Sequence, residues 1–170
     1  GYQLTRLQGC ESRLEELAVQ QEKEVLDVES GLFQMQMMAN WSDELQEILL
    51  EDTLEYTAES YWLETAKLYD LWCAGDEAAL RKELSFEAQL EAMTDEERAE
   101  YEAQKAYIDE YNKTMSYDRN DGMLEVAKQY LESGDTIFFA VGLAHLLDDV
   151  NGLVDALRDA GYTVELVNYA

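Results

Sequence analysis

The sequence has no proline, a single histidine and few positive charges. Twelve lysine and arginine residues stand against 38 aspartates and glutamates, which gives a formal net charge of -26. A field of this sign repels phosphate backbones and anionic lipid surfaces, so binding to nucleic acid or to a membrane surface is disfavoured. Solubility is the simplest explanation of the acidity, and attraction of a cation or a basic peptide is the alternative.

Long apolar runs are missing as well. No segment approaches the roughly 20 apolar residues that cross a bilayer, and no basic start with an apolar stretch behind it marks a signal peptide. The chain begins at Gly1 and not at methionine. A removed signal would favour the cell envelope or the outside of a bacterial cell. Cys10 and Cys73 form either one disulfide or two separate thiols, and their spacing does not decide between these.

The helical signals are strong. Apolar residues make up 47% of the 170 residues, enough for a single domain over 1–170 with a buried core. Helical periodicity fills the middle of the chain from about residue 42 to 115. Ser42 is a good N-cap for one long helix that runs to Gly75, Asp76 can cap the next helix, and Thr94 opens a capping box.

Three short segments are predicted to be strands, at residues 24–28, 136–141 and 163–167. The second of these ends at Gly142, where the lack of a Cβ allows a sharp turn. Asn151 is expected to cap a helix between the last two, so residues 136–168 predict a βαβ-like unit. We therefore expect an α/β fold of α+β character, with a small mixed sheet of about three strands and a large helical middle region.

The single histidine lies just beyond the end of a predicted strand, because His145 follows Gly142 by three residues. In open α/β sheets, ligands bind beyond the carboxyl ends of the strands. His145 is therefore the leading candidate for a functional residue. The alternative is a structural histidine held by a hydrogen bond.

A series of motifs resembles the TraB/PrgY/GumN family across the whole chain. The matching segments are Glu29 at the end of a strand-like run, the Arg119-Asn120 pair near a helix start, Gly142-x-x-His145-Leu146, and Gly161-Tyr162-x-Val164. The first Gly-x-x-His strand of the family and a further strand that ends in glutamate are missing. The chain thus resembles the C-terminal two thirds of the domain, with an incomplete sheet.

The resemblance implies a metal-dependent hydrolase or protease, the activity described for the Tiki branch of the family. On the matching positions, His145 and Glu29 would be ligands of a manganese, cobalt or zinc ion, and Glu29 could instead be a general base. Arg119 would pair with a carboxylate or stabilise developing negative charge. Asn120 and Gly142 would contact the substrate, a peptide or a protein.

Each of these roles has a simpler alternative. Glu29 can cap the helix that is expected to begin near Gly31, and Arg119 can be an ordinary salt-bridge partner. A catalytic zinc-like site needs about three protein ligands, so one imidazole with one or two carboxylates is half a site. The chain would then be inactive alone, as a non-catalytic module that binds a peptide or a partner, or as a degenerate family member. An incomplete sheet would also expose an unpaired edge, which predicts a homo-oligomer.

Overall fold

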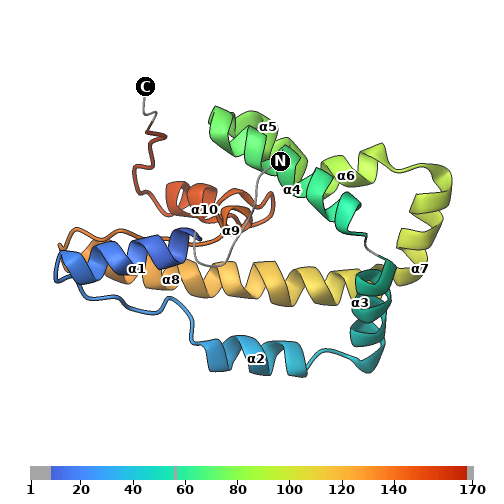
Figure 1. Cartoon of the computed structure of the whole chain (residues 1–170), viewed down its shortest axis with the longest axis horizontal. Helices are drawn as coiled ribbons and strands as arrows, with labels where there is room; N and C mark the ends of the chain where they lie inside the picture. Colours follow the sequence, from blue (N-terminus) through green and yellow to red (C-terminus); the bar gives the residue numbers. More distant parts are fainter. Residues whose placement is uncertain (1–8, 56, 168–170) are drawn as a thin grey trace.

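The computed structural model describes residues 9–55 and 57–167, and this part of the chain is built from helices (Figure 1). In chain order they are α1 (Cys10–Gln20), α2 (Gly31–Ala39), α3 (Asp43–Glu55), α4 (Ala58–Ala74), α5 (Glu77–Leu84), α6 (Phe86–Ala92), α7 (Asp95–Asn112), the π-helix η2 (Lys113–Tyr117), α8 (Asp118–Ser133), α9 (Leu143–Leu147) and α10 (Leu153–Asp159). Among the described residues, no helix has the length and apolarity of a membrane span.

The predicted α/β fold is wrong, because residues 9–55 and 57–167 contain no strand and look all-α. The three segments expected to be strands are irregular, and each of them exposes apolar side chains: Val25 is 60% exposed, Phe138 is 79% exposed and Leu166 is 58% exposed. Strand-like composition favours a pleated surface, but a strand also needs a neighbour whose backbone completes its hydrogen bonds. The predicted βαβ-like unit at 136–168 is therefore coil, α9, α10 and coil. The sheet edge expected to drive oligomerisation has no counterpart in these residues.

The long helix predicted from Ser42 to Gly75 is two helices, α3 and α4. Helix α4 begins with a capping box, in which the Thr57 hydroxyl accepts from the backbone N–H of Ser60 at 3.1 Å and the Ser60 hydroxyl accepts from the N–H of Thr57 at 3.2 Å. Such a box satisfies N–H groups that a helix start leaves free. The predicted caps at Asp76 and Thr94 are confirmed.

Helices α7, η2 and α8 form one continuous helical stretch. Residues on both sides of each junction, Asn112, Lys113, Tyr117 and Asp118, all have right-handed helical backbone angles. Aspartate is a common N-cap residue and Asp118 would be expected to cap α8. It does not do so, because the chain is already helical at Tyr117 and Asp118. Helix α8 ends at Gly134, whose positive φ of 82° suits a residue without Cβ.

The C-terminal helices pack onto this stretch. Helix α10 contacts α8 and α9, and α5 contacts α9 from the other side (Figure 1). The buried apolar residues of the described part are Leu45, Leu80, Tyr101, Met123, Ala127, Leu147 and Leu153. One polar side chain, Asn120 on α8, is equally buried, with 1% of its surface exposed. The core thus holds an amide at the place where α8 meets the segment around α9.

Candidate functional site

Glu29 and Arg119 form an ion pair that joins the segment before α2 to the first turn of α8. The Nε atom of Arg119 lies 3.1 Å from Oε1 and 3.0 Å from Oε2 of Glu29, and Nη2 lies 2.8 Å from Oε2. Only 12% of the arginine side chain and 10% of the glutamate side chain are exposed. The planar fork of the guanidinium matches the carboxylate, so the pair is held in one geometry.

Neighbouring groups fix the same pair further. Arg119 Nη1 donates to the carbonyl oxygen of Met115 at 3.2 Å, and Gln34 Nε2 donates to Oε2 of Glu29 at 3.3 Å. Glu29 is not the cap of α2, because the Ser30 hydroxyl accepts from the N–H of Phe33 and fills that role. Both carboxylate oxygens of Glu29 therefore accept hydrogen bonds, Oε1 from Arg119 and Oε2 from Arg119 and Gln34.

His145 is held by a chain of amides that ends on a backbone carbonyl. Asn151 Nδ2 lies 2.9 Å from the carbonyl oxygen of Tyr117, an atom that can only accept. The Oδ1 of Asn151 is thereby left to accept from Asn120 Nδ2 at 3.0 Å, and Asn120 Oδ1 lies 2.7 Å from Nδ1 of His145. The imidazole must donate in this last contact. Its proton consequently lies on Nδ1, and neutral His145 keeps a lone pair on Nε2.

The electrostatic surroundings keep this imidazole neutral. Burial lowers the pKa of His145, the positive charge of Arg119 lowers it further, and Glu29 and Asp148 oppose the shift. Arg119 and Asn120 are consecutive residues of α8, so the ion pair and the histidine are held from the same turn of one helix. The structure thus brings together Glu29, Arg119, Asn120 and His145, which the sequence presents in three separate segments.

Gly142, the other predicted substrate-binding residue, contacts His145 through its backbone. It precedes α9 with a φ of -58°, and its carbonyl oxygen accepts from the backbone N–H of His145 at 3.0 Å. A Cβ at this position would lie 3.6 Å from Cδ2 of His145, which is ordinary contact. Neither the backbone conformation at Gly142 nor the space around it therefore requires a glycine.

Two residues of the loop between α9 and α10 escaped the sequence reasoning. Asn151 is predicted as a helix cap, yet its side chain links Asn120 to Tyr117. At Gly152 the backbone requires a glycine, because a Cβ there would lie 2.5 Å from the carbonyl oxygen of Asp148. The Asn-Gly dipeptide is a turn signal and was the available clue.

The donor set fits a divalent metal poorly. Within residues 9–55 and 57–167, no three histidine, cysteine, aspartate or glutamate side chains gather as a metal site requires. His145 could offer Nε2, but the oxygens of Glu29 already accept from Arg119 and Gln34. About three protein ligands are needed for a catalytic site, and the described residues do not supply them.

Comparisons with known proteins place this chain in a family. No curated protein and no solved structure matches the chain. One family model does, and it covers residues 2–166, nearly the full length. The match includes every residue of the site described above. The chain belongs to the TraB/PrgY/gumN family.

Proposed function

We propose that this family member hydrolyses an amide bond in a peptide or protein, with His145 as the proton acceptor. The observation that carries the proposal is the amide chain from Tyr117 to His145, which leaves Nε2 as the acting atom. A general base works best when it is unprotonated at the working pH and firmly oriented. The lowered pKa and the contact with Asn120 supply both conditions.

The proposed reaction assigns one task to each group. His145 Nε2 takes a proton from water as the water oxygen bonds to the amide carbon. The same proton then passes to the amide nitrogen as the carbon–nitrogen bond breaks, which gives a carboxylic acid and a free amine. Arg119 has five N–H groups, and three of its nitrogens already donate to Glu29 and Met115. A remaining N–H can face negative charge that develops on the substrate oxygen. Glu29 holds the guanidinium in place.

A non-catalytic binding module is the second candidate function. It is favoured by the engagement of Glu29, which leaves His145 as the one candidate acid or base among the described site residues. This module would retain a peptide without cleaving it. Retention would not need the lone pair on Nε2.

Mass spectrometry of a diverse peptide mixture separates the two functions. Wild type and His145→Ala are each incubated with the mixture, once with chelator and once with manganese, cobalt or zinc. The proposal predicts cleavage by the wild type and a rate at least about 100-fold lower in the variant. Equal cleavage by both proteins would remove His145 from the reaction, and retention without cleavage by both would establish the binding module.

A further inference from the structure

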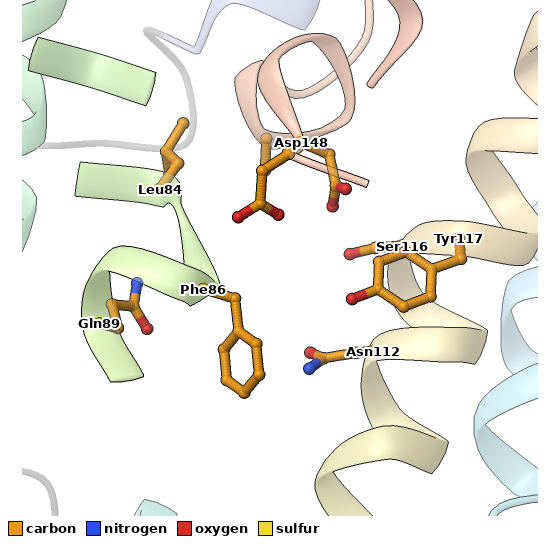
Figure 2. A pocket seen from close by; sticks show the side chains of 9 residues that line it. Leu84, Phe86, Gln89, Asn112, Ser116, Tyr117 and Asp148 are labelled. Carbon is orange, nitrogen blue, oxygen red and sulfur yellow. The ribbon is translucent and has the colours of Figure 1, made fainter. Parts of the chain in front are cut away.

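A cavity of about 180 Å³ lies between the π-helix and the segments that face it. Figure 2 shows Asn112 at the end of α7, and Ser116 and Tyr117 of η2, reaching towards Phe86 and Gln89 on the opposite wall. The full lining is Leu84, Phe86, Gln89, Asn112, Ser116, Tyr117, Ala144, Asp148 and Asp149. Two carboxylates thus line a small, partly open cavity together with the rings of Phe86 and Tyr117.

Each carboxylate is held through one oxygen, and no described residue donates a hydrogen bond to the other oxygen of either. Asp148 Oδ1 accepts from the backbone N–H of Val150 at 2.8 Å, and Asp149 Oδ2 accepts from the Ser85 hydroxyl at 2.9 Å. No lysine or arginine lines the cavity, and neither aspartate has an ion-pair partner in the described part of the chain. Two adjacent negative charges are therefore fixed but not neutralised.

The π-helix η2, which lines one side of the cavity, is a second feature typical of binding sites. Ser116 and Tyr117 belong to η2, and π-helical turns inside longer helices occur often at functional sites. Burial raises the pKa of Tyr117, and the charges of Asp148 and Asp149 raise it further, so its phenol stays neutral. The wall then offers hydroxyl and amide groups that add no competing charge.

We propose that this cavity binds the guanidinium group of an arginine side chain. A guanidinium is planar, so it can lie against the ring of Phe86 while its N–H groups donate to Asp148 and Asp149. The overall charge of -26 would attract such a side chain from a distance. Ala144 and Asp148 flank His145 in sequence, so a bound arginine would place its peptide beside the candidate site. Binding does not require that His145 act in catalysis.

Titration with N-acetyl-arginine amide tests the cavity without any reaction. Chemical shifts of the ¹⁵N-labelled protein are followed, with N-acetyl-citrulline amide as the neutral counterpart. We expect saturable shifts of Ser116 and Tyr117 with the arginine probe and binding about tenfold weaker with citrulline. Equal binding of both probes, or shifts that never involve the cavity, would overturn the proposal.

Charge-matched variants separate the cavity from the general acidic field. Asp149→Asn removes one charge but keeps an oxygen for the Ser85 hydroxyl, and Glu47→Gln removes one charge from the exposed face of α3. Asp149→Asn should weaken arginine binding about tenfold, and Glu47→Gln should leave it within about twofold. Equal weakening would show attraction by the field alone. His145→Ala should bind the probe normally, so failure of the hydrolase proposal would not be mistaken for failure of this one.

Discussion

Nδ1 of His145 lies 2.7 Å from Oδ1 of Asn120, so a partly buried imidazole rests on an amide with only 1% of its surface exposed. Asn120 cannot turn over without losing its contact with Asn151, which is itself tied to the carbonyl oxygen of Tyr117. The carbonyl oxygen of Tyr117 thus sets the proton position on the His145 ring through the side chains of Asn151 and Asn120. Several consequences of this arrangement and of the neighbouring ion pair can be measured.

The stability of the protein should depend on pH through His145. Its pKa is lowered in the folded state, so between that value and the unfolded value of about 6.5 the unfolded chain binds more protons. The stabilising contribution is fully present above about pH 6.5 and is lost as pH falls through the folded pKa. Urea unfolding of wild type and His145→Ala checks this at about pH 7.5 and about pH 5. The advantage of the wild type should shrink at the lower pH, and a constant advantage would contradict the assignment.

Removal of one partner from the buried ion pair should be costly. Arg119→Met leaves the Glu29 carboxylate without its counter-charge at a site where 10% of the side chain is exposed. Loss of one member of a buried pair typically lowers the free energy of unfolding by about 3–5 kcal/mol. Lys105→Met provides the control, because Lys105 forms an exposed i,i+4 pair with Asp109 and its loss should change stability little. Similar effects of the two substitutions, measured by urea unfolding, would show that the Glu29–Arg119 pair is not buried.

A glycine pair tests the loop that positions Asn151. Gly152→Ala would place a Cβ 2.5 Å from a carbonyl oxygen, so the loop must shift and stability should fall by about 1–3 kcal/mol. Gly122→Ala in α8 meets nothing within 4 Å and should instead raise stability by about 0.5–1 kcal/mol. Thermal unfolding of both variants measures whether each substitution lowers or raises stability. A stabilising effect of Gly152→Ala would contradict the close approach of position 152 to the carbonyl oxygen of Asp148.

Local signals explain what the sequence could predict about the fold. The caps at Asp76 and Thr94 depend on side chains within three residues of the helix start, and both were readable. Asp118 carries the same kind of signal but lies inside a helix, because η2 continues α7 into α8. The predictions of strands were wrong because they depend on non-local pairing. Residues such as Phe138 have strand-like character, but pairing depends on distant backbone that a local pattern does not report.

The candidate site shows a similar division. Glu29, Arg119 and His145 could be named from motifs, but the use of both Glu29 oxygens by Arg119 depends on a contact across 90 residues of sequence. Asn151 was expected to cap a helix, and the Asn-Gly dipeptide indicates a turn. Neither signal reports the hydrogen bonds of its side chain to Asn120 and Tyr117. Motifs therefore pointed to members of the candidate site, and the hydrogen bonds determine which of their atoms remain without a partner.

The proton position on His145 is the most direct test of the central claim. His145 is the sole histidine, so its two ring nitrogens give one unambiguous pair of ¹⁵N resonances in a long-range ¹H–¹⁵N spectrum. Above its pKa, the wild type should carry the proton on Nδ1 with Nε2 unprotonated, and Asn151→Ala should lose this preference. A wild-type ring protonated on Nε2, or a ring unaffected by Asn151→Ala, would contradict the account.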